Sequence, residues 1–227
     1  MTEPCPFDHA FAKPVRREWN DPPPPEEDAT GIKWSNWAAA AGVLVLVFVV
    51  IGLWPVRLAD PTKHPAVGHS LSDLRLEGLT GTQRPITSDD LRGQVALISF
   101  WSSTDAESTR LLSHLLVIFK RLESRADFAP LLVSYQPQAS LADLRSETAT
   151  FLESAKVAIP TYWDPEEATL RSVVSLSDRP LGSGPVHLPV TVLLDREGTI
   201  RGVWYGYTKG IEKQIARMVA ELLGAEK

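Results

Sequence analysis

From residue 70 onward, short apolar runs alternate with stretches whose apolar residues recur every three or four positions. Gln94–Phe100, Phe128–Tyr135 and Val190–Asp195 are nearly continuous apolar runs. Runs of this kind are typical of strands that are buried on both faces. The alternation of such strands with helices predicts an α/β fold, in which helices cover both faces of a sheet.

Three amphipathic helices are predicted between and after these strands. They cover residues 112–122, about Ser140–Lys156 and about Gly210–Leu223. A short turn containing glycine separates Val190–Asp195 from a further strand over Thr199–Tyr205, so these two strands form a hairpin. The predicted order is β-α-β-α-β-β-α. Because it combines parallel crossovers with a hairpin, the sheet should be mixed.

One long segment of the chain carries no charge, between Lys33 and Arg57. Within it, Trp37–Trp54 reads WAAAAGVLVLVFVVIGLW, which as a helix would cross the roughly 30 Å apolar core of a bilayer. Tryptophans at both ends suit the membrane interfaces. The alternatives are a buried core helix, which the uncharged length disfavours, and a cleaved signal peptide, which the long polar leader disfavours. We therefore predict one transmembrane helix over residues 34–56.

The predicted span divides the chain into four parts. These are a disordered polar leader over 1–33, the transmembrane helix over 34–56, a linker over 57–69 and an α/β domain over 70–227. Basic residues are slightly more numerous on the N-terminal side, which favours a cytoplasmic N-terminus and an extracytoplasmic C-terminal domain, periplasmic if the source is bacterial. The membrane is thus an expected partner. The net charge of −5 argues against nucleic acid.

Two phrases in the α/β domain resemble one protein family. Asp89–Ser103 reads DDLRGQVALISFWSS, which is similar to the segment before the active site of membrane-anchored thiol–disulfide oxidoreductases of the TlpA/ResA-like type, in the thioredoxin superfamily. His187–Gly198 reads HLPVTVLLDREG, which is similar to the cis-proline strand and hairpin of the same family. The resemblance covers roughly residues 66–227. It implies a thioredoxin-like α/β sandwich with a mixed sheet, preceded by one transmembrane helix.

The two positions where the resemblance places the family's redox cysteines are Asp105 and Ser108. The only cysteine of the chain is Cys5, in the leader. Exchange requires an attacking thiolate and, for a two-electron cycle, a second thiol. Direct exchange activity is therefore not expected, and whether the chain is an enzyme stays open. Asp105 suits a helix N-cap, and Thr104 with Glu107 offers an alternative capping box one residue earlier.

The resemblance further implies a binding groove formed by Trp101, Thr104, Asp105, Leu188 and Pro189. A cis bond before Pro189 would present the backbone of Leu188 to an extended ligand strand, although a trans proline at a strand start is the alternative. Trp101 suits either the groove edge or the core. We predict a membrane-anchored, redox-inactive thioredoxin-like domain that binds a protein or peptide outside the cytoplasm. The alternative is an oxidoreductase-family protein, in redox homeostasis or in cytochrome or disulfide maturation, that works with a thiol-bearing partner.

Two other chemistries fit the same residues less well. Asp105, Ser108 and His187 would supply a hydrolytic triad, but no nucleophile elbow surrounds Ser108. Asp105 and His187 alone are too few ligands for a metal site, and the leader sequence Cys5-Pro-Phe-Asp-His9 suits a free thiol in a flexible tail better than a metal site. Neither a metal nor a cofactor is therefore expected.

Overall fold

Strand β3 (Val95–Trp101) lies inside the sheet, and every one of its residues is buried. The computed structural model describes residues 41–43, 59–176 and 186–224. β3 pairs in parallel with β4 (Phe128–Ser134) and antiparallel with β6 (Val190–Leu194). β6 pairs in turn with β7 (Ile200–Tyr205). The predicted buried strands and their hairpin are confirmed.

Three further strands extend the sheet beyond β4. β5 (Thr161–Trp163) lies parallel to β4, β1 (Arg75–Thr80) lies antiparallel to β5, and β2 (Ile86–Thr87) forms the edge. The order across the sheet is β2-β1-β5-β4-β3-β6-β7. The sheet is mixed, as predicted, but these three strands were not predicted from the sequence. β2 and β5 are too short to show a period, and the burial of β1 does not alternate strictly.

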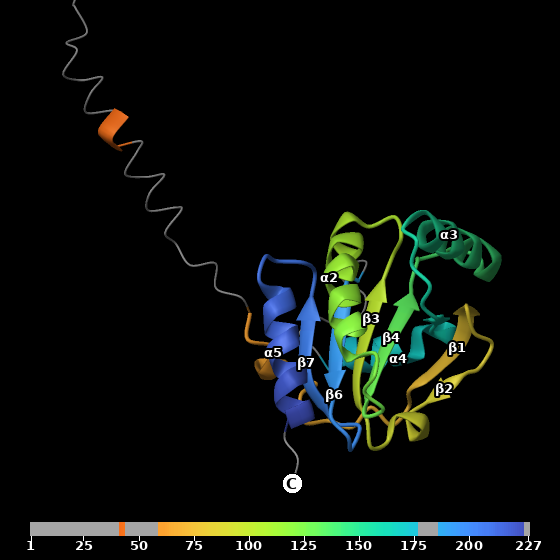
Figure 1. Ribbon diagram of the computed structural model, residues 1–227, viewed down its shortest axis with the longest axis horizontal. Helices are drawn as coiled ribbons and strands as arrows, with labels where there is room; N and C mark the ends of the chain where they lie inside the picture. The colour runs from red at the N-terminus through yellow and green to blue at the C-terminus, as the bar shows by residue number, and fades with distance from the viewer. Residues whose placement is uncertain (1–40, 44–58, 177–185, 225–227) are drawn as a thin grey trace, which may run out of the picture. The chain divides into compact units, whose positions relative to one another are not determined.

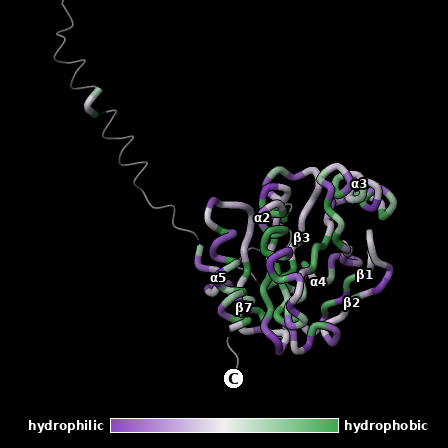
Figure 2. Tube along the Cα trace, viewed as in Figure 1, coloured by the Kyte–Doolittle hydropathy of each residue, from purple (hydrophilic) through white to green (hydrophobic). Residues whose placement is uncertain are grey.

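Helices cover both faces of the sheet (Figure 1). α2 (Ala106–Leu122), α3 (Leu141–Ser154) and α5 (Ile211–Gly224) share one apolar cluster with the sheet, and α4 (Ala168–Ser175) shares the other. Figure 2 shows hydrophobic residues along β3 in the middle of the domain and hydrophilic residues in the peripheral loops. The predicted α/β sandwich and its three long helices are confirmed. α4 was missed, since it has only eight residues.

Three short 3-10 helices accompany these elements in the described part of the domain: η1 (Pro61–Lys63), η2 (Asp89–Leu91) and η3 (Pro165–Glu167).

Part of the segment expected as a linker packs against the domain. After η1, the side chain of Ala66 is fully buried, and the N–H of Gly68 donates to the carbonyl of Ile200 at 2.8 Å. The packed chain therefore begins before residue 70.

Most of the predicted leader and membrane span lies outside the described residues. Of the segment 34–56, only residues 41–43 are described, and they are helical and exposed. Within the described ranges, no helix has both the length and the apolar character needed to cross a membrane. The span over 34–56 stays a prediction.

Candidate functional site

The carboxylate of Asp105 caps helix α2, which begins directly after β3. Asp105 has extended backbone, with φ −95° and ψ 123°, and its Oδ2 accepts a hydrogen bond from the N–H of Ser108 at 2.7 Å. This satisfies a helix N–H and places negative charge at the positive end of the helix dipole. The predicted N-cap is confirmed. The alternative capping box is not formed, because the hydroxyls of Thr104 and Ser102 pair with each other at 2.9 Å.

Ser108 is the least solvated polar residue of this helix start. It is fully buried, and its Oγ has no hydrogen-bond partner among the described residues. Buried hydroxyls are normally paired, because leaving one unpaired costs about 1–3 kcal/mol. A weakly polar thiol would suit this environment better than a hydroxyl does.

Replacement of Ser108 by alanine should therefore stabilise the protein. We expect Ser108→Ala to raise the free energy of unfolding by about 1 kcal/mol, from removal of the unpaired hydroxyl and from the higher helix propensity of alanine. Thermal unfolding followed by circular dichroism measures the change. The matched control is Ser113→Ala on the exposed face of the same helix, which gives the same gain in helix propensity but removes an exposed hydroxyl that donates to the carbonyl of Arg110 at 2.7 Å. Equal effects at the two positions would contradict the prediction.

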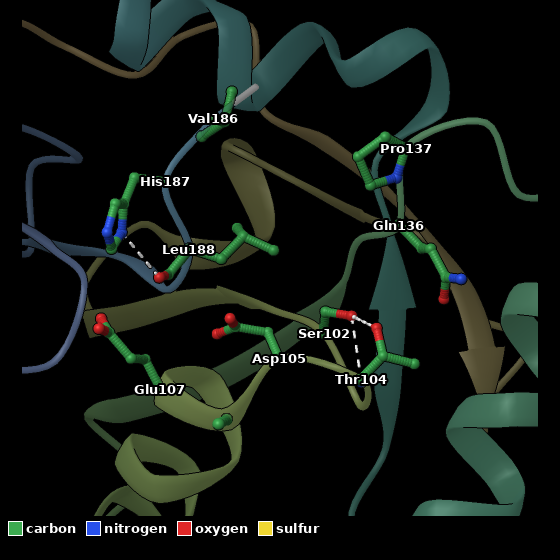
Figure 3. Close-up of a pocket in the computed structure, with 10 residues that line it drawn as sticks. Ser102, Thr104, Asp105, Glu107, Gln136, Pro137, Val186, His187 and Leu188 are labelled. Carbon is green, nitrogen blue, oxygen red and sulfur yellow. Dashed lines mark hydrogen bonds between the residues drawn. The ribbon is translucent and has the colours of Figure 1, made fainter. Parts of the chain in front are cut away.

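An open pocket of about 360 Å³ lies over the N-terminus of α2 (Figure 3). Three segments form its walls: the β3–α2 junction, the loop after β4 and the residues before β6. The lining residues are Ser102, Thr104, Asp105, Ala106, Glu107, Gln136, Pro137, Val186, His187 and Leu188. The pocket thus brings together Thr104, Asp105 and Leu188, three of the five residues predicted for the groove.

The other two predicted groove residues are buried and do not line this pocket. Trp101 is 1% exposed, and its ring centroid lies 5.3 Å from that of Phe151 on α3. It therefore has the core position that the sequence analysis gave as one of two alternatives. Pro189 is buried directly before β6, and its bond to Leu188 is cis, as the resemblance implies.

Glu107 and His187 meet beside Gly206, which directly follows β7. Oε2 of Glu107 accepts a hydrogen bond from the N–H of Tyr207 at 2.8 Å. Nδ1 of His187 lies 3.0 Å from the carbonyl oxygen of Leu188, and because a carbonyl only accepts, Nδ1 is the donor. A Cβ atom on Gly206 would lie 2.9 Å from Oε2 of Glu107 and 2.9 Å from Cε1 of His187. The glycine therefore lets the two side chains approach the same point.

The arrangement does not support the alternative chemistries at this site. The Oγ of Ser108 has no partner among the described residues, so no neighbouring base activates it. Asp105 and His187 both line the pocket. In the described part of the chain, however, no group of three His, Cys, Asp or Glu side chains is placed to hold a metal ion.

Several residues of the pocket wall were not predicted from the sequence. Gln136, Pro137 and Val186 were not expected there, and Glu107 was expected only in a capping box. Glu107 reaches a backbone N–H one hundred positions away, and no local pattern signals such a contact. The loop after β4 had a usable signal, because polar residues at the carboxyl ends of parallel strands gather at one edge of a sheet.

Comparison with known proteins identifies the fold. No protein-family model and no curated protein matches the sequence. A structure from Bacteroides thetaiotaomicron, assigned as a protein disulfide isomerase, is 19% identical, with a TM-score of 0.56 over 70% of this chain and 90% of that chain. A structure from Chlorobium tepidum, assigned as the thiol:disulfide interchange protein DsbE, is 18% identical, with a TM-score of 0.54 over 70% and 98%.

A secreted thiol-disulfide isomerase from Corynebacterium glutamicum is similar to the same extent. It is 18% identical, with a TM-score of 0.51 over 67% of this chain and 84% of that chain. At these identities the likeness concerns the fold. The chain therefore has a thioredoxin-like α/β fold with a mixed sheet.

Proposed function

We propose that this chain is a thioredoxin-like binding protein without thiol–disulfide exchange activity of its own. The observation that carries the proposal is the carboxylate of Asp105 at the N-terminus of α2. In an exchange enzyme that helix end stabilises a thiolate. In this chain the carboxylate already accepts the N–H of Ser108 at 2.7 Å. Neither side chain can attack a disulfide, and the single cysteine of the chain is Cys5.

The open pocket is the part of the site that remains available for binding. It has polar residues on the side of α2 and apolar residues before β6. A wall of this mixed composition suits a segment of a peptide or protein, whose backbone is polar and whose side chains vary. We propose that the ligand is such a segment.

We further propose that residues 34–56 anchor the protein in a membrane, with the N-terminus in the cytoplasm and the domain outside it. The proposal is supported by the uncharged stretch between Lys33 and Arg57 and by its terminal tryptophans. It is also supported by the description of the similar protein from Corynebacterium glutamicum as secreted.

The wild-type chain should fail to reduce disulfides. In an insulin-reduction assay with dithiothreitol, we expect the rate to equal that of a no-protein control, because no thiol stands at the helix start. Turnover above the control that persists in Cys5→Ser would overturn the proposal.

Site-specific photo-crosslinking tests the proposed binding of a protein. A crosslinker at exposed Thr104, in the pocket, should capture a protein in native membranes. A crosslinker at exposed Lys120, at the other end of α2, should not.

A second candidate function is a role in thiol–disulfide exchange together with another protein, and the descriptions of the similar structures favour it. All three are described as proteins of thiol–disulfide exchange. On this alternative, the pocket presents a substrate to a separate thiol-bearing partner. The protein captured at position 104 distinguishes the two functions: a partner with a Cys-x-x-Cys pair, whose insulin reduction the wild-type chain accelerates, would favour the alternative.

A further inference from the structure

We propose that the pocket over α2 selects a peptide segment that carries an arginine or lysine side chain. The inference rests on the proposed binding function and names its ligand class. Two of the lining residues, Asp105 and Glu107, carry carboxylates, and none of the ten is lysine or arginine. The pocket is therefore negatively charged at neutral pH, and a cationic group is complementary to it.

In each carboxylate, one oxygen accepts a hydrogen bond that fixes the side chain, and the other oxygen is available to a ligand. Oδ2 of Asp105 accepts the N–H of Ser108 at 2.7 Å, and Oε2 of Glu107 accepts the N–H of Tyr207 at 2.8 Å. Within the described residues, no hydrogen bond or ion pair reaches the second oxygen of either group. In Figure 3 both side chains lie on the side of the pocket formed by the start of α2, Glu107 below His187 and Asp105 below Leu188. The unused oxygens are acceptors for the N–H groups of a cation.

The opposite wall of the pocket suits the stem of a long basic side chain. Val186 and Pro137 line the side that faces the carboxylates, and Leu188 lies between (Figure 3). Arginine and lysine pack their methylene groups along apolar surface while the charged head stays in polar surroundings. The apolar wall therefore suits the methylene groups of an arginine or lysine side chain, and the wall with the two carboxylates suits its charged group.

Two other ligand classes fit the pocket less well. A bare helix N-terminus attracts anions, but the carboxylate of Asp105 already occupies that place. A metal ion would need further ligands, and the described residues hold no group of three suitable side chains. The two carboxylates and the apolar residues of the facing wall favour an organic cation on a chain.

The test is the binding of peptides of defined charge to the full chain in detergent. The probes are nonapeptide mixtures that are random except at the central position, which is fixed in turn as Arg, Lys, Leu or Glu. We expect the Arg and Lys mixtures to bind at least about tenfold more tightly than the Leu mixture in fluorescence anisotropy, and the Glu mixture to bind most weakly. The preference should shrink as salt is raised from 50 to 300 mM.

Conservative variants assign the preference to the two carboxylates. Asp105→Asn keeps an N-cap side chain, and Glu107→Gln keeps an acceptor for the N–H of Tyr207, so each removes charge with little change to the fold. Each should reduce the preference for Arg over Leu about threefold to tenfold. The matched control is Glu123→Gln, which removes the same charge at the exposed far end of α2 and should leave the preference unchanged.

The possible results separate this inference from the proposed function. Equal binding of all four mixtures, or a preference for basic peptides that survives both variants, would overturn the charge selection and leave a binding protein of another specificity. Failure of every mixture to bind a chain shown to be folded by circular dichroism would count against the binding function itself, and the inference would fall with it.

Discussion

Joint replacement of Asp105 and Ser108 by cysteine is expected to create disulfide-reductase activity in this chain. The two positions have Cys-x-x-Cys spacing at the N-terminus of α2, and the first already holds a negative charge there. A helix N-terminus lowers the pKa of a thiol. A fall from about 8.5 to about 7 would raise the thiolate fraction at pH 7 from about 3% to about half.

The second position is as important as the first. Ser108 is fully buried directly behind the cap, so a thiol there would be shielded from outside disulfides and close to the first sulfur. A second thiol of this kind resolves the mixed disulfide that the first one forms. Its burial should cost less than that of the present hydroxyl, which lacks a partner among the described residues.

Insulin reduction with dithiothreitol measures the gain. All variants carry Cys5→Ser, so that the leader thiol makes no contribution. We expect the double variant to work at least about tenfold faster than the Cys5→Ser protein. Asp105→Cys alone should form mixed disulfides without turnover, and Ser108→Cys alone should do neither. A folded double variant with no activity would show that the chain lacks more of the exchange machinery than its two thiols.

The fold was predictable from sequence where segments are long and uniformly buried. β3 lies inside the sheet between two pairing strands, so its residues are apolar without interruption. α2 has one buried face and one solvated face, which produces a clear helical period. β5 has three residues and β2 has two, and their position depends on the strands beside them rather than on their own composition. Pairing with neighbouring strands, more than local composition, decides whether such short segments form strands.

The site was predictable only where its residues belong to a local pattern. Asp105 was identified as a cap because capping depends on residues three positions apart. Trp101 could not be placed, since an aromatic residue at a strand end suits either the core or a groove edge. Its packing against Phe151, fifty positions later, decides for the core. The joint approach of Glu107 and His187 to Gly206 likewise involves three distant segments.

Gly206→Ala should lower the free energy of unfolding by about 2 kcal/mol and distort the pocket. The backbone of Gly206 has φ +64°, which costs a residue with a side chain about 1–2 kcal/mol. The added Cβ would also lie 2.9 Å from Oε2 of Glu107. That carboxylate must then move away, which weakens its hydrogen bond with the N–H of Tyr207 at a cost of about 1 kcal/mol.

Two comparisons separate backbone strain from the contact with Glu107. Gly198→Ala has a similar φ of +79° but open space around the new Cβ, so it should cost only about 1 kcal/mol. In a double-mutant cycle, Glu107→Ala should reduce the cost of Gly206→Ala, because the two residues are in contact. Denaturant unfolding gives both values. Equal costs at positions 198 and 206, with strict additivity in the cycle, would show that Gly206 serves the turn alone and does not position Glu107 in the pocket.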